Sequence, residues 1–314
     1  MRERPRIAIT LGDPRGIGPE IVAAALARTN VRQSADFVLV GAEPASVPGV
    51  ARCTVGPYDP AAGERGAGAL SAAAIELAID LALAGEVDGL VTGPVSKAAL
   101  AAAGCDAPGH TELLRDRCGV AEVTMMMCAE RTPLGGPIRM ALLTTHVPLR
   151  EVPGALTVDL VVARAGIAAR ALRRDWGFDP PRLAFAGLNP HASEGGRFGD
   201  EEARVLAPAA ERLEAEGRAV VAGIFPADTV FRLCLDRTVD AVVVPYHDVG
   251  LAVLKTVAGD AGVNITAGLP FPRTAPDHGT AFDIAGRGVA RPHSMVEAIR
   301  VCARLCRVRS GAPA

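Results

Sequence analysis

Residues 241–247 read AVVVPYH, a short apolar run that leads into a histidine. Residues 140–146 (MALLTTH) and 183–191 (LAFAGLNPH) have the same form. Apolar runs of this length are typical of strands buried on both faces of a parallel sheet. His146, His191 and His247 would therefore follow the carboxyl ends of strands, where open α/β sheets bind their ligands.

The rest of the chain alternates similar apolar runs with helical patterns, which predicts βα units and an α/β fold. Further strands are expected at residues 6–11, 37–40, 89–92 and 123–128. Helices are expected at residues 19–28, 68–84, 154–173, 200–216 and 294–307. In the second helix, Leu70, Ala74, Leu77 and Leu81 recur at helical spacing and predict its buried face. No Pro- or Ser-rich joint divides the chain, so its domains are expected to be interleaved in sequence.

Composition narrows the class of protein. A chain of 314 residues suggests roughly two domains, and 4% aromatic residues require an aliphatic core. The net charge of −2 offers no basic surface for nucleic acid. No apolar run approaches the roughly 20 residues that span a bilayer, and the first one is too short for a signal peptide, so a cytoplasmic protein is expected. The seven cysteines include no C-x-x-C pair, which favours free thiols.

Three imidazoles at one sheet edge are a typical donor set for a catalytic metal, because they leave positions open for substrate. Taken singly, each histidine is more often structural, so the residues alone leave both interpretations open. His110 and Thr111 lie in a segment that indicates a helix start, with Thr111 as N-cap. The positive end of that helix would depress the pKa of His110 and favour its neutral ring.

Two glycine-rich segments have alternative interpretations. Residues 12–20 lie between a strand and a helix but do not fit G-x-G-x-x-G, so they indicate a tight turn or an anion site at a helix start. Residues 277–288 would either approach a flat ligand closely or form a surface loop. The only two lysines among 33 basic residues are Lys97 and Lys255, which reflects either chance or sites that need a compact ammonium.

The ordered set of motifs resembles one family, the 4-hydroxythreonine-4-phosphate dehydrogenases of vitamin B6 synthesis. The motifs are residues 12–20, 91–97, 109–112, 144–149, 187–192, 226–229, 246–248, 262–266, 268–270, 273–274 and 277–286. The family's fold is similar to that of isopropylmalate dehydrogenase, which implies two α/β/α domains with a cleft between them. We expect the first domain at residues 1–118 plus 256–314, and the second, with the metal-binding histidines, at residues 119–255.

The resemblance also implies the residues of the site. It implies one divalent metal ion (Zn, Mg, Co or Mn) on His146, His191 and His247. It implies substrate contacts at His110, Thr111, Lys255, Asn264 and Arg273, and NAD (NADP as the alternative) at Asp277, His278, Gly279 and Asp283. Lys97 and Asp248 are the candidates for a general base. A homodimer is implied, with both chains contributing to each active site.

The chain departs from the family pattern at three places. Val249 stands where an amide side chain is usual, Arg15 replaces a small residue, and Ala275-Pro276 is unusual before Asp277. The first two changes leave open whether the substrate is 4-phosphohydroxy-L-threonine, giving a β-keto acid that decarboxylates, or a related phosphorylated sugar acid such as D-threonate or D-erythronate 4-phosphate. A three-histidine metal hydrolase is a further alternative, but the chain contains no H-E-x-x-H. A non-catalytic binding protein is less consistent with an intact set of histidines and cations.

Overall fold

The computed structural model describes residues 4–43, 46–105 and 109–312. The chain divides into two compact units, residues 1–122 with 269–314 and residues 123–268. Residues 256–268, which the sequence analysis assigns to the first domain, fall in the second unit because β10 (Val263–Ala267) pairs with β5 (Thr124–Ala129).

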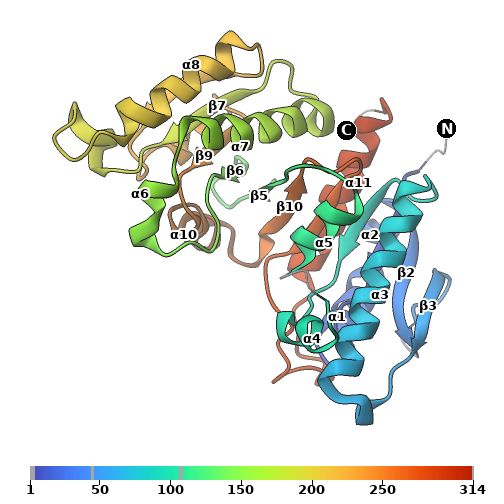
Figure 1. The fold of residues 1–314 in the computed structure, drawn as a ribbon. Helices are drawn as coiled ribbons and strands as arrows, with labels where there is room; N and C mark the ends of the chain where they lie inside the picture. Colours follow the sequence, from blue (N-terminus) through green and yellow to red (C-terminus); the bar gives the residue numbers. More distant parts are fainter. Residues whose placement is uncertain (1–3, 44–45, 106–108, 313–314) are drawn as a thin grey trace. The chain divides into compact units, whose positions relative to one another are not determined.

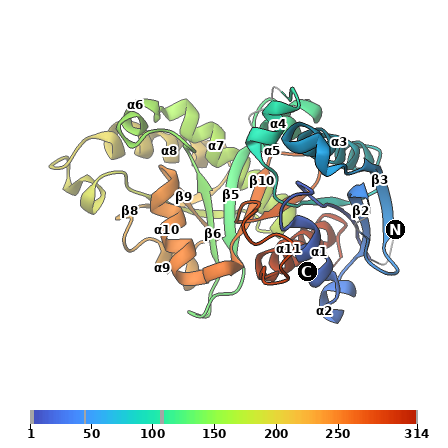
Figure 2. The same ribbon diagram turned by 90° about the horizontal axis from the view of Figure 1, so that it is seen from below.

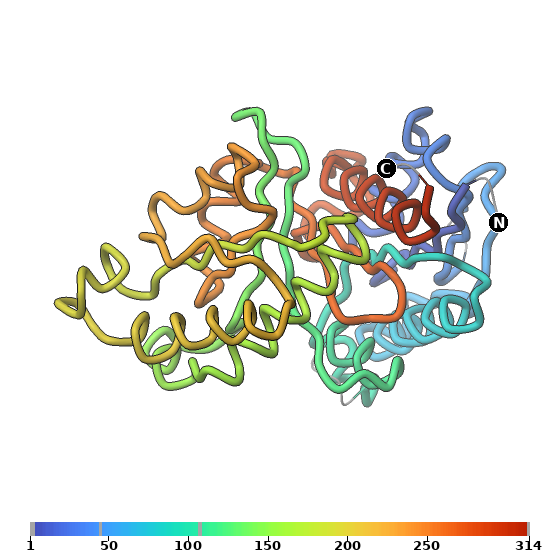
Figure 3. Tube along the Cα trace, turned by 90° about the horizontal axis from the view of Figure 1, so that it is seen from above, coloured from blue at the N-terminus to red at the C-terminus, as the bar shows by residue number. Residues whose placement is uncertain are grey.

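The first unit is a parallel sheet covered by helices on both faces. Its strands lie in the order β3 (Ala51–Pro57), β2 (Asp36–Glu43), β1 (Arg6–Thr10), β4 (Gly89–Thr92) and β11 (Arg273–Pro276). Figure 2 shows α3 (Gly63–Leu83), α4 (Lys97–Ala102) and α5 (His110–Arg117) on one face, with α1 (Gly18–Leu26), α2 (Thr29–Arg32) and α11 (His293–Arg309) on the other. In Figure 3 the C-terminal helix lies beside the N-terminal part of the chain, where Arg307 donates to the Ser34 carbonyl at 3.1 Å.

The second unit has a mixed sheet in the order β10-β5-β6-β9-β7-β8. The pairs β10–β5 and β5–β6 are antiparallel, whereas β6 (Ile138–Leu142), β9 (Ala241–Val244), β7 (Arg182–Ala186) and β8 (Val220–Phe225) are parallel. Helices α6 (Val152–Ala155), α7 (Val158–Ala171) and α8 (Ala207–Ala215) lie on one face, and α9 (Phe231–Leu235) and α10 (His247–Ala258) on the other (Figures 1 and 2). Aliphatic residues of β6 and β9, among them Met140 and Val242, pack with Leu251 and Leu254 of α10 into a core.

The predicted α/β class is confirmed, and each strand expected from the sequence is present, with ends that differ by at most three residues. The expected buried face of α3 is wrong. Of its four predicted positions only Ala74 is buried, and the helix instead packs through small residues and isoleucines such as Gly68, Ile75 and Ile79. A Cβ on Gly68 would lie 1.8 Å from the Ala99 carbonyl oxygen, so α4 approaches too closely for leucine on this face.

The helical segment Pro60–Leu83 is long and apolar enough to cross a membrane by length and composition. Core helices of soluble proteins pass the same test. Within it, α3 packs against β1, β2 and β4 of its own unit, as a core helix does.

Candidate active site

The predicted histidines follow three neighbouring parallel strands of the second unit. His146 comes after β6, His247 after β9 and His191 after β7, and the strand order β6-β9-β7 brings their carboxyl ends to one edge. Hydrogen bonds also connect two of the three loops, since the Thr144 hydroxyl donates to the Pro245 carbonyl at 2.8 Å. All three histidines therefore follow the carboxyl edge of the sheet, as predicted from the sequence.

His146 and His247 lie close enough to bind one ion. Their ring centroids are 5.7 Å apart and their planes are inclined at 43°. Two imidazoles that each bind a metal through nitrogen at about 2.1 Å have ring centres roughly 5–6 Å apart. The Nδ1 atom of His247 also lies 2.7 Å from Oδ1 of Asp248, a contact that orients the ring and leaves Nε2 for a ligand. This pair fits two ligands of a shared metal.

The third histidine, His191, lies on a separate loop. His191 is exposed, and its ring centroid lies 6.2 Å from that of Phe198. Among the described residues, no group of three His, Cys, Asp or Glu side chains is close enough to hold a metal ion. One chain therefore shows two of the three expected ligands together, and the third on a loop at the same sheet edge.

The backbone at these histidines is unusual. His146 has φ 56°, and four consecutive non-glycine residues, His191, Ala192, Ser193 and Glu194, have φ of 54°, 51°, 69° and 43°. The left-handed region costs an L-residue roughly 1–2 kcal/mol. Such strain is retained mostly at functional sites, where it aims side chains that ordinary backbone would direct elsewhere.

Helix α10 carries three residues singled out in the sequence. Asp248 lies in its first turn, and Lys255 lies exposed in its last turn. Val249 packs against the aliphatic core of the second unit, which explains why a valine is accepted there. Asn264, the remaining predicted contact in this unit, is half-buried in β10 opposite Met127 of β5.

The first unit contains a cationic group formed by buried Arg273, half-buried His110 and exposed Lys97. Arg273 is only 3% exposed, and its Nη2 donates to the Thr92 hydroxyl at 2.5 Å. Burial lowers the pKa of Arg273 to about 10. Burial, followed by the nearby charges of Arg273 and Lys97, lowers the pKa of His110 to about 3. His110 is therefore neutral at physiological pH, as expected, but burial and two cations are the cause.

The Nε2 atom of His110 suits contact with an anion. It is buried and has no hydrogen-bond partner among the described residues. A buried polar nitrogen beside two cations is completed well by an anion such as phosphate, which accepts several hydrogen bonds. Thr92 belongs to this group and was missed in the sequence because it reads as a strand end. Its place within a quoted motif was the available signal.

The prediction that Thr111 is the N-cap is wrong. Helix α5 begins at His110, its N-cap is Gly109 with φ 177°, and Thr111 lies inside the first turn. A Cβ on Gly109 would lie 3.4 Å from Lys97 Cε, so the chain passes close to that lysine here.

The two glycine-rich segments pack against each other in the first unit. The Ile17 amide donates to the Thr280 carbonyl at 3.0 Å, and a Cβ on Gly16 would lie 2.8 Å from that oxygen. Arg15 pairs with buried Asp13 at 2.8 Å, and its guanidinium lies 4.9 Å from the centroid of the Phe282 ring. The unusual Arg15 therefore braces one glycine-rich segment against the other.

The candidate cofactor residues lie on this second segment. The Asp277 backbone amide donates to Ser294 Oγ at 3.0 Å, while His278, Gly279 and Asp283 are exposed. Ala275 and Pro276, the unusual pair before Asp277, are buried in β11 and continue that strand.

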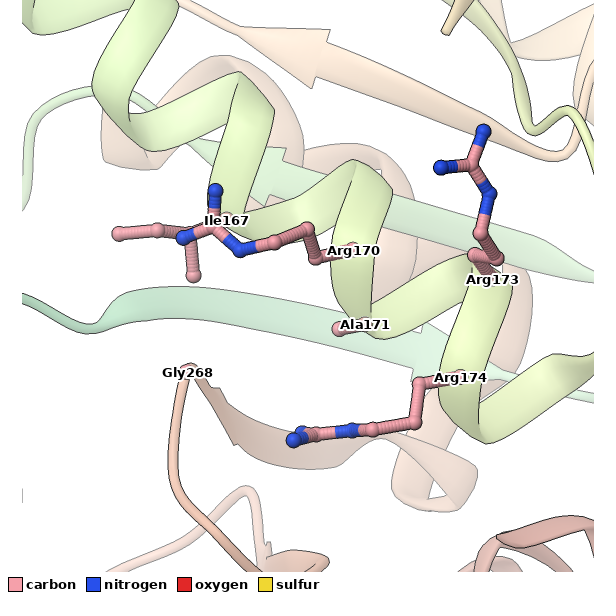
Figure 4. A pocket seen from close by; sticks show the side chains of 6 residues that line it. All are labelled: Ile167, Arg170, Ala171, Arg173, Arg174 and Gly268. Atoms are coloured by element: carbon pink, nitrogen blue, oxygen red, sulfur yellow. The ribbon is translucent and has the colours of Figure 1, made fainter. Parts of the chain in front are cut away.

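The second unit also contains a cavity of about 360 Å³. Its lining consists of Ile167, Arg170, Ala171, Arg173, Arg174 and Gly268. In Figure 4, Arg170 and Arg174 lie on the side of the helix that faces Gly268, whereas the head of Arg173 points away. Because it contains none of the predicted site residues, the cavity is not the candidate active site.

Comparison with known proteins gives a consistent result. Residues 9–302 match the family described as pyridoxal phosphate biosynthetic protein PdxA. The chain is 41% identical to 4-hydroxythreonine-4-phosphate dehydrogenase of Erythrobacter litoralis, covering 95% of each chain. It is similar to the crystal structure of the Klebsiella pneumoniae enzyme of that name, with TM-score 0.84, 38% identity and coverage of 97% of this chain and 98% of that one.

A more distant match concerns the fold alone. A β-decarboxylating dehydrogenase from Thermococcus kodakarensis aligns with TM-score 0.50 and 15% identity over 98% of this chain and 84% of that one.

Proposed function

Because the chain belongs to the PdxA family of pyridoxal phosphate biosynthetic proteins, we propose that it oxidises 4-phosphohydroxy-L-threonine with NAD and a divalent metal ion. The product is a β-keto acid, and its new carbonyl group accepts the electrons released when carbon dioxide leaves. The dehydrogenase activity accords with the names of its relatives. The single observation that carries the proposal is the presence of His146, His191 and His247 after three neighbouring parallel strands.

The histidines would hold the metal, and the chemistry of the donors fits that role. When bound, a divalent ion supplies Lewis acidity, which lowers the pKa of a coordinated alcohol and stabilises charge on its oxygen. Asp248 orients the His247 ring through Nδ1. Asp248 and Lys97 remain the candidates for the group that accepts the alcohol proton.

The cationic group of the first unit would bind the phosphate of the substrate. Arg273 offers a planar fork of donors, held in place by Thr92. His110 is neutral and would donate or accept one hydrogen bond according to its tautomer. We further propose that Thr111, Lys255 and Asn264 contact the substrate.

The loop containing Asp277, His278, Gly279 and Asp283 would bind the adenosine side of NAD. Its exposed glycines and polar residues allow a flat ligand to approach the backbone closely. An acidic residue near the ribose favours NAD over NADP, since a carboxylate accepts from the 2′-hydroxyl and repels a 2′-phosphate.

We also propose that the enzyme is a cytoplasmic homodimer in which both chains build each site. Two of the expected metal ligands lie together in one chain while the third lies on its own loop. In the dimer, the third ligand of each metal ion would come from the second copy.

The experiment is an assay of the purified protein with a divalent metal and NAD or NADP, following reduced nicotinamide. The panel contains 4-phosphohydroxy-L-threonine and the 4-phosphates of D-threonate and D-erythronate. Highest kcat/KM with 4-phosphohydroxy-L-threonine supports the proposal. A preference for either sugar acid would replace the substrate but keep the chemistry. Release of inorganic phosphate without reduced nicotinamide would instead indicate a metal hydrolase.

A further inference from the structure

The loop that carries His191 is built from strained backbone. Its left-handed residues run from His191 to Glu194, and none of the four is glycine. Glycine reaches this region at no steric cost, whereas each of these residues does so against its own Cβ. Such a loop needs contacts from outside itself to hold its shape.

Glu202 provides those contacts. Its Oε1 accepts a hydrogen bond from the Asn189 amide at 2.8 Å, and its Oε2 accepts one from the Asn189 side chain at 2.9 Å. The Ser193 hydroxyl donates a third bond to the same Oε2. The Glu202 carboxylate therefore binds the loop on both sides of His191, two residues before it and two residues after it, while Glu201 Oε2 accepts a further bond from the Asn189 side chain alone, at 2.7 Å.

The position of Glu202 suits a fixed anchor. It is only 5% exposed, in the first turn of a helical segment that spans Glu202–Leu206 and runs directly into α8. Burial alone would raise the pKa of Glu202, but the bonds from Asn189 and Ser193 outweigh it, so the pKa is lowered and the carboxylate stays charged. The loop is also closely packed from below, because a Cβ on Gly187 would lie 3.0 Å from Ala192 Cα.

We propose that Glu202 is a positioning residue that holds the loop of residues 189–194 in its left-handed form and thereby sets the affinity of His191 for the metal ion. This inference rests on the proposed function, in which His191 is a metal ligand. In this role Glu202 would contact neither the metal ion nor the substrate, since its carboxylate is bonded to Asn189 and Ser193. It acts by keeping the imidazole in the binding orientation before the ion arrives, so that the metal does not have to order the loop.

The chemistry of the carboxylate is essential to this role. All three of its partners are donors, and a charged carboxylate accepts from all of them. In Glu202→Gln the amide nitrogen replaces one accepting oxygen and faces the Asn189 amide nitrogen, donor against donor. Size is unchanged, so the variant alters hydrogen bonding without opening a cavity.

The test measures the metal dissociation constant of the folded protein by competition with a chromogenic chelator for Zn²⁺ and for Mn²⁺. We expect Glu202→Gln to weaken binding about 10- to 100-fold, the range found for residues that orient metal ligands. The matched control is Glu214→Gln, which also removes a carboxylate that accepts a backbone N–H bond, here from Val221 at 3.0 Å, but on α8. The control should bind metal as the wild type does.

Two further variants keep the test decisive. Ser193→Ala removes one of the three bonds and should weaken metal binding less than Glu202→Gln, and it serves if the latter does not fold. His191→Ala separates the two levels of the proposal. If His191→Ala keeps full metal affinity, the metal role of His191 fails, and the inference about Glu202 fails with it. If His191→Ala loses affinity while Glu202→Gln keeps it, only the inference about Glu202 is wrong.

If Glu202 only stabilised the fold, the measurements would differ from those expected above. The thermal midpoint of metal-free Glu202→Gln would fall, but the metal affinity of the folded protein would match that of the Glu214→Gln control. That result would overturn the inference.

Discussion

The cationic group of the first unit and the histidines of the second unit are prepared for their ligands in opposite ways. Arg273 and the Nε2 atom of His110 are buried, and Arg273 is fixed by Thr92. His146 and His191 are exposed, on backbone that is itself strained. In the cationic group, burying the charge of Arg273 costs free energy, and a bound anion would offset that cost. At the histidines, the left-handed backbone costs free energy, and contacts from neighbouring residues must hold the loops in that conformation.

The largest effect is expected at the histidines. His146→Ala, His191→Ala or His247→Ala should remove bound metal and reduce kcat by about three orders of magnitude or more, because Lewis-acid stabilisation is worth several kcal/mol. The fold should persist, since His146 and His191 are exposed and His247 is only partly covered. Elemental analysis, circular dichroism and steady-state kinetics measure these three properties.

The control for this series is His293→Ala, which removes another partly exposed ring from the start of α11. It should retain full metal content. Full metal content in any of the three ligand variants would remove that histidine from the site.

The second effect concerns the buried group. Arg273→Lys keeps the charge but loses the fork that reaches Thr92, so kcat/KM should fall about 10- to 150-fold, the worth of a charge-assisted hydrogen bond. The loss should appear mainly in KM for the phosphorylated substrate, with metal content unchanged. Arg150→Lys is the matched control, because the Arg150 side chain is 83% exposed and should tolerate the change. Loss of metal in Arg273→Lys would contradict the division of roles.

This contrast also explains what the sequence could predict. The three strands that lead into histidines could be predicted because buried parallel strands are continuously apolar, and each histidine follows its strand closely. Strands β3, β8, β10 and β11 were missed. Polar residues or prolines interrupt the apolar pattern in β3, β10 and β11, whereas β8 was missed although its sequence, VVAGIF, is apolar throughout. The face of α3 was misjudged because hydrophobicity favours leucine, whereas close approach of α4 selects glycine and alanine.

The supporting residues of the site were harder to predict. Glu202 lies near the start of the helix expected at residues 200–216, where nothing in the sequence marks it as buried, yet it is buried against the His191 loop. Left-handed backbone at Ala192 and Ser193 has no local signal either, since neither residue favours it. Both features depend on tertiary contacts that residue spacing does not contain.

A smaller effect is expected at Lys255. Its side chain is exposed in the last turn of α10, where an ammonium and a guanidinium both find room. Lys255→Ala should lower kcat/KM about tenfold, and Lys255→Arg by less than about threefold, because an exposed charge is screened by solvent. Steady-state kinetics of the two variants provide the comparison. Equal losses would mean that the substrate contact requires a compact ammonium, as in a buried site.

The smallest effect is a pH dependence of stability that arises from His110. Its pKa is about 3 in the folded chain, below the unperturbed value of about 6.5. Between these values the unfolded chain binds a proton that the folded chain does not, so acidification favours unfolding. Relative to His110→Asn, which cannot titrate, the wild type should lose up to about 1 kcal/mol per pH unit below pH 6.5. Urea unfolding of both metal-free proteins at pH 7.5, 6.5 and 5.5 measures the difference. Phosphate should reduce the slope, because an anion beside the ring favours its protonated form. Parallel pH profiles for the two proteins would show that His110 is not held neutral by burial. The proposed contrast between a cationic group around buried Arg273 and a strained metal-binding loop would then not hold for the first unit.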